Sequence, residues 1–203
     1  MEKYNYPKGG YSIPETSLKD WRKIGERHLA DYGIFSIRRV ESESPRTGKT
    51  IPFQILECGL WTNVFPVTLN HEVVMIRQYR HGTEKITLEI PGGLVERGES
   101  PAHAARREMV EETGYDSETI VPLGYVEPNL AFISNSCHTF LAPGAASVGR
   151  QSLDHGEDIE VVTVPMDRLG TLVADGTITH SLVVAAIYLL ELHIRQHPDW
   201  NGI

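Results

Sequence analysis

The apolar positions between residues 101 and 113 recur with the period of a helix. One face of this helix carries Ala102, Ala105 and Met109, and the adjacent side carries Ala104, Glu108, Glu111 and Glu112. Ser100 followed by Pro101 predicts the start of the helix, and Gly114 predicts its end. We expect the apolar face to pack on a core, which leaves three glutamates crowded beside it.

Alternating apolar and polar residues predict strands in both halves of the chain. Two strands, at residues 34–37 and 53–56, are separated by a polar loop and indicate an N-terminal sheet. Further strands are expected at residues 73–80 and 137–142. Helices are expected at residues 17–30 around Trp21 and Ile24, from Met166 or Asp167 to Gly176, and at residues 181–196. These elements divide the chain into an N-terminal β-sheet element, residues 1–60, and a larger domain, residues 61–203.

Composition is that of a globular protein, with 203 residues of which 40% are hydrophobic and 23% charged. No apolar run reaches the roughly 18 residues of a membrane span, and the N-terminus lacks a secretory signal, so a cytoplasmic location is expected. A net charge of −8 argues against nucleic acid as a partner. Cys58 and Cys137 are expected to be buried, reduced thiols, and Arg38-Arg39 a solvated strand edge.

The three glutamates of the predicted helix repel one another unless a positive charge relieves them. Gly92 and Gly93 follow Pro91, and such a pair permits positive φ angles and close approach of the backbone to a ligand. Hard divalent cations such as Mg²⁺ prefer carboxylate and carbonyl oxygens and are usually shared with substrate phosphates. The pattern therefore predicts a cation site that acts on a phosphate compound. Arg107 and Glu99 are expected to support this site without binding the ion.

Residues 93–115 also match, at every fixed position, the pattern Gly, five residues, Glu, seven residues, Arg-Glu-apolar-any-Glu-Glu-any-Gly-apolar. A chance match has a probability of roughly 10⁻⁷. This is the Nudix box, and the chain resembles Nudix hydrolases. These enzymes use Mg²⁺ or Mn²⁺ to cleave nucleoside diphosphates that are linked to a further group. The resemblance implies an α+β fold, an α/β/α sandwich with a mixed sheet. It also implies that the Gly92 carbonyl, Glu108 and Glu112 bind metal, with Glu111 as a further ligand or the base.

Outside the box, the chain resembles the ADP-ribose pyrophosphatase subgroup in four stretches, at residues 73–80, 89–93, 127–142 and 154–162. The resemblance implies that Arg80 contacts a substrate phosphate and that Pro128 lies at the substrate. Glu157 matches a metal-binding position, whereas His155 stands where the subgroup has a carboxylate base. The base therefore stays open among Glu111, Glu157 and His155, with a carboxylate favoured.

The subgroup forms homodimers through its N-terminal sheet and stacks aromatic residues on adenine, for which Phe35 and Trp61 are the candidates here. The implied reaction is Mg²⁺-dependent hydrolysis of ADP-ribose or a related ADP-sugar to AMP and a sugar phosphate. Two alternatives stay open. One is a Nudix hydrolase of another nucleoside diphosphate derivative, and the other is a non-catalytic sensor that binds ADP-ribose.

Overall fold

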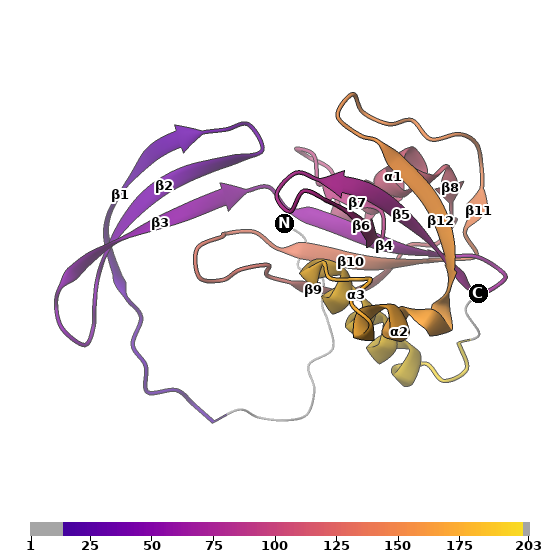
Figure 1. Ribbon diagram of the computed structural model, residues 1–203. Coiled ribbons are helices and arrows are strands. Elements are labelled where there is room, and N and C mark those ends of the chain that lie inside the picture. Colours follow the sequence, from indigo (N-terminus) through magenta and orange to yellow (C-terminus); the bar gives the residue numbers. More distant parts are fainter. Residues whose placement is uncertain (1–13, 201–203) are drawn as a thin grey trace. The chain divides into compact units, whose positions relative to one another are not determined.

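The computed structural model describes residues 14–200 (Figure 1). The chain forms two compact units, which we describe separately. The N-terminal unit consists of Met1–Cys58 with Asn129–Ser134, and the C-terminal unit consists of Gly59–Pro128 with Asn135–Ile203. None of the described helices is long and apolar enough to cross a membrane.

The N-terminal unit contains an antiparallel sheet of three described strands, in the order β1-β2-β3. Their bounds are β1 Arg22–Asp31, β2 Phe35–Glu43 and β3 Thr50–Cys58. Gly33, with φ of 80°, turns the chain from β1 into β2, and its N–H donates to Oδ1 of Asp31 at 2.9 Å. The 129–134 segment joins this unit because Leu56 of β3 exchanges backbone hydrogen bonds with Phe132 and Ser134.

The expected helix at residues 17–30 is wrong, because this part of the chain forms β1. Irregularities in the pairing of β1 with β2, between Lys23 and Gly25 and between His28 and Ala30, break the two-residue alternation that identifies a strand. Trp21 nevertheless makes an edge contact with Phe53 of β3, with ring centroids 5.5 Å apart.

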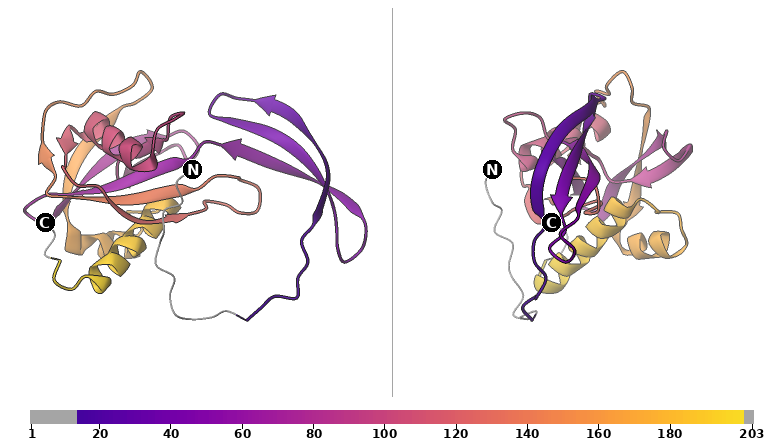
Figure 2. Two further views of the ribbon diagram at one scale, coloured as in Figure 1. Left: turned by 180° about the vertical axis from the view of Figure 1, so that it is seen from behind. Right: turned by 90° about the vertical axis from the view of Figure 1, so that its left-hand side faces the viewer.

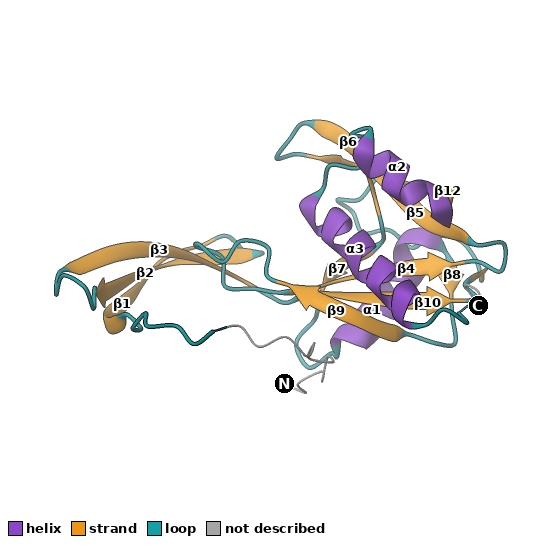
Figure 3. Cartoon of the chain, turned by 90° about the horizontal axis from the view of Figure 1, so that it is seen from below, coloured by secondary structure: helices purple, strands orange, loops and turns teal. Residues whose placement is uncertain are grey.

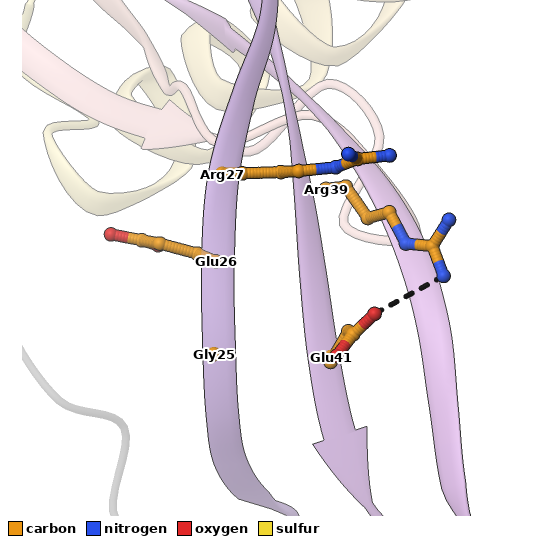
Figure 4. A pocket seen from close by; sticks show the side chains of 5 residues that line it. All are labelled: Gly25, Glu26, Arg27, Arg39 and Glu41. Atoms are coloured by element: carbon orange, nitrogen blue, oxygen red, sulfur yellow. Dashed lines mark ion pairs between the residues drawn. The ribbon is translucent and has the colours of Figure 1, made fainter.

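The description of Arg38-Arg39 as a strand edge is also wrong, because β2 is the central strand of its sheet. Arg38 pairs with Glu26 and Glu57 on the neighbouring strands, at 2.9 and 2.7 Å. A pocket on the same sheet is lined by Gly25, Glu26, Arg27, Arg39 and Glu41, and Arg39 pairs with Glu41 at 3.1 Å (Figure 4). It contains none of the predicted metal or catalytic residues.

The C-terminal unit is built on a mixed sheet of seven described strands. Five follow the order β12-β5-β4-β10-β9, while β6 pairs with β5 and β7 with β4. Only β10 and β4 among these pairs run parallel. The strand bounds are β4 Trp61–Val67, β5 Glu72–Arg80, β6 Lys85–Glu89, β7 Gly92–Leu94, β9 Val121–Val126, β10 Cys137–Pro143 and β12 Ile159–Pro165. A separate small pair is formed by β8, Tyr115–Asp116, and β11, Ala146–Ser147.

Helices cover both faces of this sheet, which gives the α/β/α layers expected. Helix α1, Pro101–Thr113, lies on one face, whereas α2, Leu169–Ala174, and α3, Ser181–Gln196, lie on the other (Figures 2 and 3). A short 3₁₀ turn, η1, Met166–Arg168, leads into α2. The main hydrophobic core lies between the sheet and α3, where Phe65, Met75, Leu141 and Leu190 are almost completely buried.

Helix α1 has the predicted ends. Oγ of Ser100 accepts the backbone N–H of His103 at 3.2 Å, and Gly114 ends the helix with φ of 69°. Ala104, Ala105 and Met109 are fully buried against the sheet. Because Glu112 is also buried, the acidic side of the helix turns partly toward the sheet. Its glutamates are therefore held at a fixed position beside strands β4 and β7.

Candidate functional site

The glycine loop lies against both a strand and the acidic helix. Gly92 is paired with Asn63 of β4, and a side-chain carbon on Gly92 would overlap the carbonyl oxygen of Thr62. A side-chain carbon on Gly93 would overlap the carboxylate of Glu108. Neither glycine is among the described residues with positive φ. Close approach of the backbone, and not a left-handed conformation, is therefore the reason for glycine here.

Glu112 is the most buried carboxylate of the helix, with 3% of its surface exposed. Its Oε2 accepts the backbone N–H of Gly92 at 2.8 Å. Burial raises its pKa to about 8, and the charges of Glu108 and Glu157 add to the rise. Burial likewise raises the pKa of Glu108, with a smaller contribution from Glu157. We call Glu108, Glu112 and Glu157 the carboxylate cluster.

Arg107 joins the helix to the loop before it. Its guanidinium donates to both oxygens of Glu99 at 3.1 Å, to Glu108 at 2.8 Å and to Glu111 at 3.0 Å. It also donates to the backbone carbonyl of Leu94 at 3.1 Å. These contacts agree with the supporting role expected for Arg107 and Glu99. The hydrogen bond from Arg107 is the main reason that the pKa of Glu99 falls to about 2.

The loop that carries Glu157 is attached to the C-terminal end of α1. Ser152 N–H donates to the carbonyl of Glu111 at 2.8 Å. The amide of Gln151 donates to the carbonyls of Glu112, at 2.6 Å, and Ile159, at 3.1 Å. Within the loop, Oε2 of Glu157 accepts the N–H of Asp154 at 3.0 Å. These bonds hold Glu157 near the helix, whereas the neighbouring His155 is exposed.

Arg80, at the end of β5, forms a two-point ion pair with Glu89, at the end of β6. Nε and Nη2 of Arg80 lie 2.8 and 2.7 Å from the two carboxylate oxygens. Thr87 donates its hydroxyl to Oε1 of Glu89 at 2.6 Å. Nδ1 of His180, just before α3, lies 3.4 Å from Oε2. Sequence reasoning noted Glu89 but gave it no role and missed His180, since the two are 91 positions apart in the numbering.

The other three predicted substrate residues stand in different elements of the chain. Trp61 begins β4 and is partly buried. It pairs with Leu94 of β7 and Cys137 of β10. Pro128 ends the first segment of the C-terminal unit. Phe35 begins β2 in the N-terminal unit, where its ring lies 5.2 Å from that of Tyr32. Among the described residues, the hydrogen bonds to the carboxylate cluster come from Gly92, Arg107 and Asp154, and not from Trp61 or Pro128.

The donor groups fit a hard divalent cation, although within residues 14–200 no three His, Cys, Asp or Glu side chains gather as a ready-made metal cage. Glu111 is turned to Arg107, and Glu157 to the N–H of Asp154. Glu112, however, is buried and Glu108 largely so, and burial together with the neighbouring carboxylates raises the pKa of both; a bound cation would favour their charged forms. Oxygen ligands on a rigid helix beside a glycine backbone suit Mg²⁺ or Mn²⁺.

Comparisons with known proteins agree with this geometry. The model of the NUDIX domain matches residues 62–186. The ADP-ribose pyrophosphatase of Bacillus subtilis is 28% identical over 176 residues, which cover 84% of this chain and 95% of that protein. The methanol dehydrogenase activator of Bacillus methanolicus is 32% identical over 82% of this chain and 93% of its own length.

Among solved structures, that of an ADP compounds hydrolase superposes with a TM-score of 0.79 at 21% identity, and covers 90% of this chain and 98% of that chain. This likeness supports the mixed sheet and its layers of helices. The match of the domain model over more than half of the sequence shows that this chain belongs to the NUDIX domain family.

Proposed function

We propose that this protein hydrolyses the pyrophosphate bond of ADP-ribose or a related ADP-sugar, and gives AMP and a sugar phosphate. The observation that carries the proposal is the arrangement of the partly buried Glu108 and the buried Glu112 against the glycine loop, in a complete Nudix box. Relatives named ADP-ribose pyrophosphatase in Bacillus subtilis and Mycobacterium tuberculosis, each aligned over more than four fifths of this chain, support the choice of substrate.

The cation, Mg²⁺ or Mn²⁺, would be held by the Gly92 carbonyl, Glu108, Glu112 and Glu157, with Glu111 as a further ligand. When bound, it neutralises diphosphate charge and lowers the pKa of a water molecule. The residues of the chain fix this arrangement in advance, because Arg107 orients Glu108 and Glu111 and the Gly92 N–H orients Glu112. Such preorganisation is a large part of the catalytic effect in metal-assisted hydrolysis.

The base that accepts the proton of the attacking water is to be sought among Glu111, Glu157 and His155. We favour a carboxylate. Glu157 interacts electrostatically with both Glu108 and Glu112, which supports a place beside the proposed ion. His155 is exposed in the same loop, and no described contact directs its ring toward the carboxylate cluster.

On the substrate side, Arg80 is proposed to bind a phosphate, because a guanidinium offers several N–H groups in one plane. Trp61 and Phe35 are proposed to stack on the adenine, and Pro128 to line the substrate.

We also propose that residues 1–60 form a dimerisation element and that the protein acts as a homodimer in the cytoplasm. This element exposes several large apolar side chains, among them Trp21, Ile24, Leu29, Ile51 and Phe53. Analytical ultracentrifugation at micromolar concentration measures the mass directly. A monomeric mass would contradict this part of the proposal.

A substrate panel tests the main proposal. Purified protein with Mg²⁺ is given ADP-ribose, other nucleoside diphosphate sugars and a dinucleotide, and release of phosphomonoester is followed by coupling to a phosphatase. We expect ADP-ribose or another ADP-sugar to have the highest kcat/KM. A higher kcat/KM for a compound without ADP would assign a different Nudix substrate. Binding of ADP-ribose without turnover would favour a sensor.

A further inference from the structure

A buried carboxylate at the end of β6 has no role in holding the proposed cation. Glu89 is 2% exposed, yet it lies at the edge of the site, two residues before the conformationally restricted Gly92 loop begins at Pro91. Its two oxygens receive three hydrogen bonds, two from Arg80 and one from Thr87. Thr87 and Glu89 lie two positions apart on one strand, so both side chains project from the same face of the sheet.

These bonds keep Glu89 ionised although it is buried. Burial acts to raise its pKa, but the hydrogen bonds from Arg80 and Thr87 and the charge of Arg80 outweigh it, and the pKa is lowered. An ion pair of this kind, with two parallel N–H···O bonds, is stronger and more directional than a single contact. The Arg80–Glu89 pair is therefore a fixed feature of the folded protein, unlike an exposed surface ion pair.

The pair uses one edge of the guanidinium and leaves the other available. Nε and Nη2 of Arg80 are bound by Glu89, whereas Nη1 has no hydrogen-bond partner in the part of the chain that the structure describes. The Arg80 side chain is 44% exposed. The charges of Glu112 and Glu157 also act on Arg80, so its guanidinium lies in the field of the carboxylate cluster.

We propose that Glu89 is a positioning residue, which holds the Arg80 guanidinium in one orientation so that its free edge binds a phosphate of the substrate. This inference rests on the proposed function in one respect, namely that the ligand carries a diphosphate. A flexible arginine loses side-chain freedom when it binds a ligand. Because Glu89 orders Arg80 during folding, this loss does not recur when the diphosphate arrives.

A double-mutant cycle separates positioning through Arg80 from any independent effect of Glu89. The variants are Glu89→Gln, Arg80→Gln and the double substitution. Two quantities are measured for each: kcat/KM for ADP-ribose, and the affinity for ADP with Mg²⁺ by calorimetry. We expect Glu89→Gln to lower both by about 10-fold when Arg80 is present, and by less than about 2-fold when residue 80 is glutamine. In the turnover of ADP-ribose, the loss should fall mainly on KM.

Two further variants guard against a purely structural effect. Thr87→Val removes a single bond to Glu89 and keeps the shape of the strand, and it should produce a smaller loss in the same direction. Arg77 lies on β5, the strand that carries Arg80, and forms an exposed pair with Glu160 of the neighbouring β12 at 3.1 Å. Arg77→Gln breaks this pair and should leave both quantities unchanged. Thermal unfolding of every variant is measured as a check that the fold is retained.

Equal losses from Glu89→Gln in the two backgrounds would overturn the proposal, as would the absence of any loss when Arg80 is present. The proposed function fails in a different way, because then the unaltered protein does not hydrolyse ADP-ribose. Even then, the double-mutant cycle on ADP affinity measures the coupling between Glu89 and Arg80.

Discussion

The backbone N–H of Gly92 donates a 2.8 Å hydrogen bond to Oε2 of Glu112, so the glycine loop and the acidic helix are joined directly. This bond satisfies one lone pair of a carboxylate that is otherwise removed from water. A buried, uncompensated charge destabilises a fold, and it is retained where function requires it. Glu112 is thus the residue at which stability and the proposed activity should oppose each other most clearly.

Replacement of Glu112 by glutamine should abolish activity and stabilise the metal-free protein. The amide keeps an oxygen for the Gly92 N–H. It also removes an ionisable group whose pKa rises from 4.5 to about 8 on folding, so that near neutral pH the fold no longer has to protonate a carboxylate in order to bury it. Substitution of residues that only orient metal ligands lowers metal affinity or activity by about 10- to 100-fold. We therefore expect loss of a ligand itself to lower kcat/KM by at least about 100-fold. The melting temperature without metal should rise, by about 2–4 °C for each kcal/mol gained at this chain length.

Glu118→Gln provides the matched control, because Glu118 is exposed a few residues after α1. This substitution should change neither kcat/KM nor the melting temperature of the metal-free protein. Addition of Mg²⁺ should raise the melting temperature of the unaltered protein and of Glu118→Gln, since a ligand that binds the folded state stabilises it. Retained activity in Glu112→Gln, or an equal Mg²⁺ effect there, would remove Glu112 from the proposed metal site.

Arg107→Lys tests the arginine that holds the acidic helix. A lysine ammonium cannot reproduce the planar set of bonds to Glu99, Glu108 and Glu111. Loss of these charge-assisted bonds should lower the free energy of unfolding by about 1–3 kcal/mol. It should also raise the Mg²⁺ concentration needed for half-maximal activity, because Glu108 and Glu111 lose their orientation.

The neighbouring Arg106 supplies a control of the same chemistry. It forms a two-point pair with Asp116, at 2.7 and 2.8 Å, on the exposed side of the helix. Arg106→Lys should therefore change stability much less and leave the Mg²⁺ requirement unaltered. Urea unfolding of both variants measures the change in stability, and Mg²⁺ titrations of their activity measure the Mg²⁺ requirement. Equal effects at the two positions would show that Arg107 has no special role.

The sequence predicted this helix well because its signals are local. Ser100, Pro101 and Gly114 mark its ends by hydrogen bonding and backbone preference alone, and the spacing of the glutamates follows from helical geometry. The role of Arg107 was also accessible, since its partner Glu111 is one turn away. Of the two reasons expected for the glycines, positive φ is wrong. The close approach of the backbone is to Glu108, where a side-chain carbon on Gly93 would overlap the carboxylate, and this depends on how loop and helix pack.

Other features depend on contacts between distant segments and were missed. Strand β1 was predicted as a helix because two irregularities in its pairing with β2 interrupt the alternation of apolar and polar residues. Glu89 is paired with Arg80 because β5 and β6 are neighbouring strands. His180 lies beside Glu89 because it comes directly before α3, which begins close to the end of β6. Neither the partners nor the burial of Glu89 can be obtained from periodicity, since a single charged residue in a strand has no pattern.

Stability at acidic pH should reveal the Arg107–Glu99 pair. The pKa of Glu99 falls from its ordinary value of 4.5 to about 2 on folding, mainly because Arg107 donates to its carboxylate. A carboxyl with a lowered pKa stabilises the fold fully above the unfolded pKa, and this contribution is lost as the pH falls toward the folded pKa. Unfolding free energies of the unaltered protein and Glu99→Gln should therefore differ most above pH 4.5 and converge toward pH 2. A difference that is independent of pH would contradict this.

Gln151→Ala should loosen the loop that carries Glu157 without unfolding the protein. Its amide bridges the carbonyls of Glu112 and Ile159, and thereby joins the end of α1 to the start of β12. Loss of two hydrogen bonds at this junction should cost about 1–3 kcal/mol locally and raise the hydrogen-exchange rates of residues 150–158. Because Glu157 is a proposed metal ligand, kcat/KM should fall by about 10-fold. Gln196→Ala, on the exposed end of α3, is the control and should alter neither measurement. Unchanged exchange in the loop would show that Gln151 does not hold it.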